Sequence, residues 1–299
     1  MTRRSRSAHC LVVAVIIILL GPEWTHAQRA NSVPRGQPLK NSARAAEERE
    51  KGRAMFIQYL AGSAVWSGDR VNEFVNRLGQ NLARATDSPT IFTFRVIQSP
   101  EPGAQAFPGG FVAVNSGIIA LAESEAELAA VLSHEIAHVN ARHGQRHRNR
   151  LGVFSLLAMV PLMVGTGPVG LVAFLGAAAA APLVDAKFSR SFEQEADERS
   201  VYYLTRADYD PNAAVTLLER FAAFQARAGS ADRGPLLSHP PSAKRALRLR
   251  RLLQRNPMPA GGLVQTSEFE SIRREVLDHD KQLADSLRER GSDGDPASP

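Results

Sequence analysis

A pair of histidines four residues apart, His134 and His138, limits the options of this chain more than any other part of its sequence. Ser124 and Glu127 precede the pair at the spacing of a capping box, which marks the start of a helix. We therefore predict a helix over residues 125–146. Positions i and i+4 of a helix lie one turn apart on one face, so both imidazoles should point at the same spot.

Two imidazoles at one spot suit a zinc site, because neutral imidazole is a good ligand for Zn²⁺. Glu135 lies beside that face and can take a proton from a water molecule that the metal activates. The alternative is a helix that carries two solvated histidines. Leu128, Val131 and Val139 argue against it, because their spacing predicts an apolar stripe and a half-buried helix.

A catalytic zinc site needs a third protein ligand and an open position. His143 and His147 are tempting, but about 100° of rotation per residue carries His143 to the far side of a straight helix from His134. We therefore reject His143 and His147 as ligands.

A better third ligand lies downstream, where Glu193 and Asp197 are again four residues apart. Glu193 can complete the metal ligands, and Asp197 can accept the free N–H of a ligand histidine. The alternative is a solvated acidic helix face. A pair between Glu195 and Arg199 is also expected, on the opposite side of that helix.

The start of the chain fits an export signal over residues 1–27. Three arginines precede an apolar run over residues 11–20, and small residues follow at positions 25 and 27. The run is too short for a membrane span, which needs roughly 20 residues. We expect an exported protein, periplasmic or membrane-associated on the extracytoplasmic side. The only cysteine, Cys10, leaves with the signal, which excludes a catalytic thiol in the mature chain.

The mature chain is predicted to be α+β and predominantly helical, with a small β-sheet next to the histidine helix. A linker over residues 28–44 precedes a metallopeptidase domain over residues 45–255, and residues 256–299 form a C-terminal helix with a disordered tail. Besides the histidine helix, the expected elements are a helical stretch over 45–85, strands over 91–97 and 111–114 around a turn-rich loop over 100–110, and helices over 191–205, 213–225, 242–253 and 267–290.

Residues 152–184 carry no charge but include three prolines. The prolines argue against one transmembrane helix and favour a buried or membrane-abutting hairpin. Such a hairpin would cover the site as a lid. The formal charge of +6 is mild and no basic stripe with aromatic residues appears, so a nucleic-acid partner is not expected. The strand over 111–114 could accept an extended peptide at a sheet edge, or it could be an ordinary core strand.

Several stretches together resemble a known family, the metalloproteases related to the CAAX prenyl protease, which include the HtpX heat-shock protease and soluble periplasmic assembly proteases. The stretches span most of residues 50–255. They are QAFPGG at 105–110 with the strand to Gly117, residues 125–138 with Arg142 and His143, FEQEAD at 192–197, and His239-Pro240 with Arg245.

The resemblance implies a gluzincin catalytic core with Glu193 as third ligand. It also implies that His239 faces the metal, as a latching ligand or as a stabiliser of the oxyanion, with Arg245 beside it. From the residues alone, His239 would be interpreted as a loop histidine before two prolines. Arg190 is a further candidate donor to the oxyanion. The assembly proteases carry C-terminal helical repeats, whereas the residues after Leu253 suffice for about one repeat, so no repeat array is expected.

These features predict a zinc endopeptidase with one Zn²⁺ per chain, which hydrolyses exported proteins that are unfolded or misassembled. Its partners would be polypeptides in extended conformation, with peripheral membrane contact as an option. Two alternatives stay open: a chaperone-like binding module with a structural zinc, and a membrane-embedded prenyl-protein protease.

Overall fold

The computed structural model of this chain describes residues 42–152, 175, 189–227, 242–258 and 261–292. The predicted export signal, nearly all of the predicted linker, most of the uncharged run and His239 lie outside the described residues. The predominantly helical α+β class is confirmed within them.

A small mixed sheet lies at the centre of the described chain. Its strands are β1 (Thr93–Ile97), β2 (Ala104–Phe107) and β3 (Phe111–Asn115), in the order β1-β3-β2. Strand β1 pairs with β3 in parallel, and β2 pairs with β3 antiparallel. The β2–β3 connection passes through Gly109 and Gly110, both at positive φ, where glycine carries no steric penalty.

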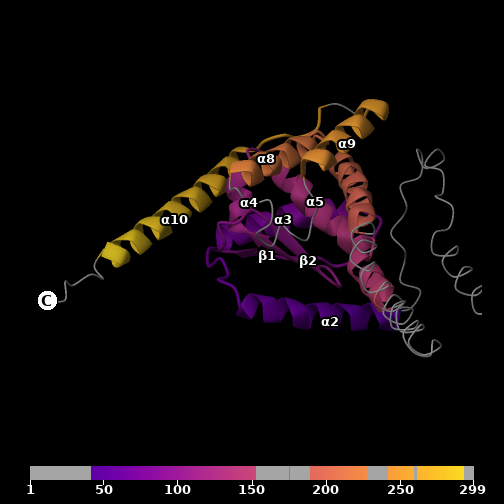
Figure 1. The fold of residues 1–299 in the computed structure, drawn as a ribbon, viewed down its shortest axis with the longest axis horizontal. Coiled ribbons are helices and arrows are strands. Elements are labelled where there is room, and N and C mark those ends of the chain that lie inside the picture. The colour runs from indigo at the N-terminus through magenta and orange to yellow at the C-terminus, as the bar shows by residue number, and fades with distance from the viewer. Residues whose placement is uncertain (1–41, 153–174, 176–188, 228–241, 259–260, 293–299) are drawn as a thin grey trace, which may run out of the picture. The chain divides into compact units, whose positions relative to one another are not determined.

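Helices cover both faces of the sheet, as Figure 1 shows with α2 (Ser42–Ala61) below it and α3 (Asp69–Arg84) above it. Side chains of a strand alternate between the two faces. Phe111 and Ala113 of β3 accordingly pack with Phe56 of α2, while Val112 and Val114 join the main core on the opposite face.

The predicted helical stretch over 45–85 is two helices rather than one. The chain leaves helix after α2, because residues 64–66 pair with the end of β1. The amide of Trp66 donates to the Val96 carbonyl at 3.0 Å, and the Ala64 carbonyl accepts from Gln98 at 2.7 Å. Sheet pairing between residues about 30 apart in the sequence overrides the local helical periodicity.

The turn-rich loop predicted over 100–110 contains a strand, β2, and this changes the role of its neighbour. Strand β3 lies between β1 and β2, so it is central and cannot accept a further strand. Of the two alternatives for residues 111–114, a sheet edge and an ordinary core strand, the structure shows the second. The outer strands are β1, which carries an isolated bridge between Val65 and Ile97, and β2, which has no further paired strand within the described residues and packs beside the histidine helix.

The histidine helix is α5 (Glu125–Asn140), preceded by the short α4 (Ser116–Leu121). Ser124 caps the helix as predicted, because its hydroxyl accepts from the Glu127 amide at 3.2 Å; the return bond of the Glu127 carboxylate comes from the Glu123 amide at 2.8 Å, one residue before the cap. Helix α5 is buried almost along its whole length rather than on one side. It therefore carries polar site residues into the core.

Helix α5 also ends earlier than predicted. Arg142 adopts a positive φ of 54°, and helical residues resume at 143–152. A residue in this conformation cannot continue an α-helix. The predicted helix over 125–146 is thus broken between residues 140 and 143, and the histidines after the break are redirected.

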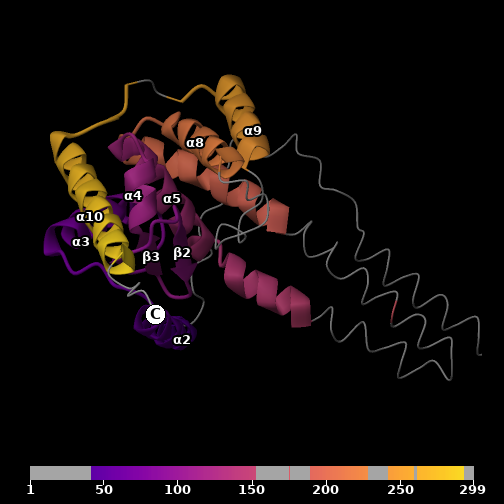
Figure 2. The same cartoon turned by 60° about the vertical axis from the view of Figure 1, so that its left-hand side comes forward.

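The remaining helices complete the core around α4 and α5. Helical residues 189–206 are followed by α8 (Ala213–Arg227), α9 (Ser242–Arg255) and α10 (Ser267–Ser292). Helices α8 and α9 lie side by side in Figure 2. Phe269, Ile272 and Val276 of α10 are fully buried in the main core. Among the described helices, none combines the length and apolar character that crossing a membrane requires.

A substitution at Gly79 tests the packing that supports α5. A Cβ atom on Gly79 of α3 would lie 2.3 Å from the ring of the buried Phe94, so Gly79→Val should lower the free energy of unfolding by about 2 to 3 kcal/mol. Chemical denaturation measures this loss. Gly62→Val is the matched control, since its Cβ would meet nothing closer than 3.8 Å. Equal stability of the two variants would contradict the tight α3–β1 contact.

Candidate metal centre

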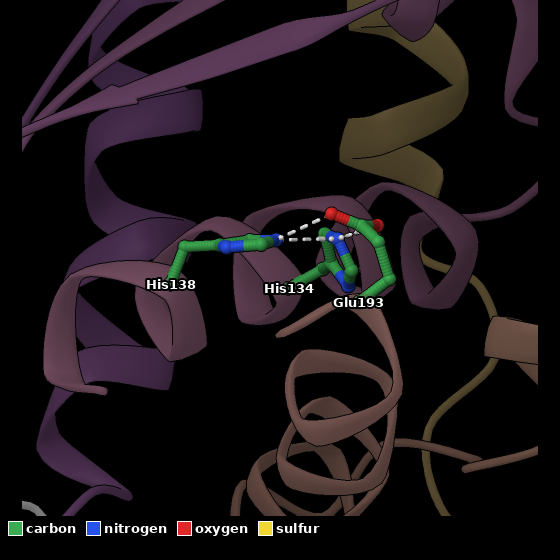
Figure 3. A group of neighbouring side chains, drawn as sticks. All are labelled: His134, His138 and Glu193. Carbon is green, nitrogen blue, oxygen red and sulfur yellow. Dashed lines mark hydrogen bonds and ion pairs between the residues drawn. The ribbon is translucent and has the colours of Figure 1, made fainter. Parts of the chain in front are cut away.

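Three side chains from two helices converge on one point, as Figure 3 shows. Helix α5 provides His134 and His138, and helical residues 189–206 provide Glu193. The two Nε2 atoms lie 3.0 Å apart, Glu193 Oε1 lies 3.3 Å from His138 Nε2, and Glu193 Oε2 lies 3.4 Å from His134 Nε2. The structure thus brings together the three predicted ligands.

These separations fit a single zinc ion. Zinc–nitrogen and zinc–oxygen bonds are close to 2.1 Å, so ligand atoms at the corners of a tetrahedron lie about 3.4 Å apart. The three observed separations fall at or just below that value. Two imidazoles and one carboxylate leave a fourth corner for substrate or water, which is the donor set of a catalytic rather than a structural zinc site.

Asp197 orients the first histidine. His134 Nδ1 lies 3.3 Å from Asp197 Oδ1, so the N–H on Nδ1 faces the carboxylate and the lone pair of Nε2 faces the metal point. Burial and the Arg245 charge lower the pKa of His134, but hydrogen bonds with Asp197 and Glu193 outweigh them and raise it to about 9. Metal binding therefore has to displace a proton from this ring at neutral pH.

Arg245 of α9 balances the buried carboxylates. It donates two hydrogen bonds to Asp197, at 2.6 and 3.1 Å, and lies 3.1 Å from Glu193 Oε2. Burial would raise the pKa of Asp197, but the charge of Arg245 and the hydrogen bond with His134 hold that pKa well below its usual range. The structure places Arg245 directly against the ligand group, and Arg248 adds a 2.6 Å contact to Asp197.

His143 orients the second histidine in the same way. Its Nδ1 lies 2.8 Å from His138 Nδ1. Burial lowers the pKa of His143, so its neutral ring can accept the N–H of His138 and leave His138 Nε2 free for the metal. His143 Nε2 then faces Glu195 Oε2 at 3.3 Å, although the two atoms are not aligned as a hydrogen bond.

His143 lies outside the group of three ligands. The reason given from the sequence, that a straight helix carries His143 to the far side from His134, does not hold. Helix α5 is not continuous with the following residues, and the break at Arg142 turns His143 back toward His138 instead of away from it. The sequence pattern did not show this, because the residue at positive φ is an arginine, and the nearest glycine, Gly144, lies two residues later within the next helical stretch.

Glu195 makes the predicted pair with Arg199 at 2.9 Å and a second with Arg146 at 2.7 Å. Burial would raise the pKa of Glu195, but contacts with His143 and Arg146 lower it well below its usual range. Glu195 therefore links the helical residues after the break to the helix that carries Glu193. These partners agree with the prediction that Glu195 lies on the opposite side of the helix from Glu193.

The site opens into a cavity of about 290 Å³, which we call the site cavity. Glu135 is 4% exposed and lines this cavity together with His134, as the role of a general base requires. Gly103, Ala104 and Gln105, at the start of β2, line it as well. Arg190 is exposed on the helix that carries Glu193, and its role at the oxyanion stays a prediction, as does that of His239.

Comparison with known proteins agrees with this geometry. The model of peptidase family M48 matches residues 69–253, which include all three converging ligands. The beta-barrel assembly-enhancing protease of Escherichia coli K12 is 31% identical over 268 residues, which are 86% of this chain and 53% of that protein. The match covers most of this chain but only about half the length of that curated relative.

Two further relatives cover less of the chain. A putative beta-barrel assembly-enhancing protease of Vibrio cholerae is 36% identical over 177 residues, 57% of this chain and 36% of that protein. The mitochondrial metalloendopeptidase OMA1 of Schizosaccharomyces pombe is 34% identical over 165 residues, 50% of this chain and 43% of that protein.

Replacing His143 tests its contact with His138. His143→Phe keeps the ring that stacks on Phe192 at 4.7 Å but removes the acceptor for His138 Nδ1. Loss of such an outer partner should weaken zinc binding about 10- to 100-fold, as competition with a chromogenic chelator would measure. His147→Phe, later on the same helical stretch, is the control and should bind zinc like the wild type. Unchanged affinity in His143→Phe would rule out the orienting role.

Acid should destabilise the zinc-free protein through Glu195. The pKa of this carboxyl is lowered on folding, so its contribution is fully present above the ordinary value of 4.5 and is lost as the pH falls below it. Glu195→Gln should lower the free energy of unfolding at pH 7 by roughly 1 to 3 kcal/mol, with a smaller difference at pH 3.5. Urea titrations at several pH values measure this. Glu198 is an exposed neighbour, and Glu198→Gln should be as stable as the wild type at each pH. A loss of stability in Glu195→Gln that does not change with pH would contradict the role assigned to Glu195.

Proposed function

The chain belongs to peptidase family M48 and carries the core of a metalloendopeptidase, and from that premise we propose that it hydrolyses exported proteins that are unfolded or misassembled. The observation that supports this proposal most directly is the position of Glu135. Its buried carboxylate lines the same cavity as the ligand His134, so a proton acceptor stands next to the metal point.

We propose that His134, His138 and Glu193 hold one Zn²⁺ per chain. When bound, zinc supplies a Lewis acid that polarises a carbonyl group and makes a water proton easier to remove near neutral pH. Glu135 takes that proton as the water oxygen attacks the carbonyl carbon, and it returns the proton to the amine nitrogen as the C–N bond breaks, which completes hydrolysis. His239 or Arg190 donates to the carbonyl oxygen as negative charge develops on it. If His239 instead latches the metal as a fourth ligand, the resting enzyme would be latent, and substrate or a movement of the loop would have to displace His239.

Strand β2 is the proposed guide for the substrate backbone. Within the described residues, its outer edge has no paired strand, and its first residues line the site cavity. An extended peptide that adds along this edge would be fixed by main-chain hydrogen bonds, whatever its sequence. Folded proteins offer few extended segments, so this mode of binding favours unfolded chains.

The proposed setting is the extracytoplasmic side of a membrane. Residues 1–27 have the layout of a cleaved export signal, and two of the relatives are described by name as enhancing the assembly of β-barrels. We extend to this chain only the coarser role of protein quality control after export. The uncharged run over 152–184 offers peripheral contact with the membrane surface.

Two rival functions have to be distinguished from the endopeptidase. A binding module with a structural zinc would need four protein ligands and no proton acceptor, whereas the described residues offer three ligands and Glu135 beside them. This donor set favours the endopeptidase over the binding module. The membrane-embedded prenyl-protein protease is distinguished by experiment, because sodium-carbonate extraction would leave it in the membrane and release a peripheral or soluble protein.

Glu135→Gln separates catalysis from metal binding. The variant keeps the size of the side chain but loses the proton acceptor, so it should retain one zinc per chain while cleavage of reduced, unfolded casein falls at least ~100-fold. Metal analysis and gel-based cleavage measure the two quantities. Glu193→Ala is the contrasting variant and should lose zinc together with activity. Equal cleavage by the wild type and Glu135→Gln would overturn the assignment.

A further inference from the structure

The site cavity has two chemically different ends. Its polar end holds His134, Glu135, Asp197 and Arg245. Its other end, which we call the apolar end, is formed by α5, α8 and α9. The lining residues there are Ala130, Val131, Leu217, Leu218, Phe221 and Leu249.

We infer that the apolar end binds a large apolar side chain of the substrate next to the scissile bond, so that the enzyme cuts within hydrophobic stretches of unfolded chains. This inference rests on the proposed function and names the substrates of the same site. The reacting carbonyl has to lie near Glu135 and the metal point. The substrate residue on either side of the scissile bond is therefore the one whose side chain can reach the apolar end, which adjoins the polar end.

The charged pair at the polar end does not attract a charged substrate side chain. Asp197 and Arg245 also line the cavity, but they face each other at 2.6 Å and are both nearly fully buried. Their charges are compensated within the protein, so a charged substrate side chain would lose its hydration without gaining a partner. An apolar side chain has no such cost.

The size of the cavity fits a large side chain. The polar and apolar ends together have a volume of about 290 Å³, several times the roughly 30 Å³ that one water molecule occupies in the liquid, and substrate backbone and side chain would share it. Water in a cavity with apolar walls lacks hydrogen-bond partners, so its replacement by a side chain such as Leu or Phe is favourable. A small side chain would leave part of that volume unfilled.

Strand β2 gives the substrate the register that this binding requires. Side chains of an extended peptide alternate between two faces, so only every second one can point into the cavity. Ala104 and Gln105 of β2 line the same cavity as Leu217 and Phe221 of α8. A peptide held along β2 would therefore present one side chain to the apolar end while its backbone lies across the polar end.

This selectivity has a physical consequence for the choice of substrate. Large apolar residues are the ones that folded proteins bury most completely. The apolar end binds a large apolar side chain, and the edge of β2 binds an extended backbone. A substrate segment meets both requirements only when the substrate is unfolded or has failed to assemble. Damaged chains are thus recognised by exposure of their core residues and not by a particular sequence.

Ala214 of α8 is the residue through which the pocket can be reshaped. It lines the site cavity and has a small side chain, so Ala214→Leu should fill part of the apolar end. Leu217→Ala should enlarge it. Ala223 lies on the exposed side of the same helix, so Ala223→Leu is the matched control.

The test maps every cleavage site in reduced, unfolded casein by mass spectrometry and then measures kcat/KM on peptides that differ only at the residues flanking the bond. The wild type should prefer Leu or Phe over Ala, Asp or Lys at one flanking position by about 10- to 200-fold. Ala214→Leu should shift this preference toward Ala by at least ~10-fold, Leu217→Ala should shift it toward Phe, and Ala223→Leu should match the wild type. Zinc content and the thermal midpoint of each variant report whether it is folded.

The outcomes separate this inference from the proposed function. If the zinc-loaded wild type cleaves no unfolded protein, the proposed function and the inference both fail. If it cleaves casein with no apolar preference at either flanking position, only the inference fails. The inference alone is likewise overturned if folded, zinc-loaded Ala214→Leu and Leu217→Ala keep the wild-type preference.

Discussion

Two carboxylates buried one helical turn apart, Glu193 and Asp197, set the condition that the rest of this structure has to meet. A buried carboxylate is costly unless positive charge and hydrogen bonds surround it. Arg245 contacts both of them, and His134 lies against both at 3.3 to 3.4 Å. Helices α5 and α9 are thereby held on either side of the helix that carries these acids.

This arrangement also prepares both histidines for a metal. Each ligand ring has its Nδ1 against a partner, Asp197 for His134 and His143 for His138, so both Nε2 atoms face the same point. Such outer partners fix the orientation of each ring, and with it the direction of the Nε2 lone pair once the ring is neutral. The ligands are preorganised by groups from separate helical segments.

The surroundings of the ligands connect the chemistry to the substrate. The same cavity extends from Glu135 to the apolar wall of α8, and it borders the outer strand β2. Backbone capture by a strand edge and side-chain capture by an apolar pocket are independent selections. Both are met by unfolded protein, and this agrees with a family whose relatives here include proteases named for the assembly of β-barrels.

Local patterns in the sequence were enough to identify the ligands and their helices. The four-residue spacings of His134 with His138 and of Glu193 with Asp197 fix directions on a helix, because helical geometry depends only on neighbours within one or two turns. The capping box at Ser124 likewise marked the start of α5 without reference to the rest of the chain. The convergence of the two helices on one cation followed from the chemistry of these residue types.

Only the tertiary structure decided what depends on contacts between distant residues. The strand over 111–114 is central and β2 is one of the two outer strands, because β3 pairs with both β1 and β2. His143 returns to His138 through a break at Arg142, a residue type that does not itself favour positive φ. The apolar end of the cavity is assembled from three helices, and its existence cannot be inferred from the periodicity of any one of them. Periodicity reports which face of an element is buried, but the neighbour that covers that face is chosen by the packing of the whole chain.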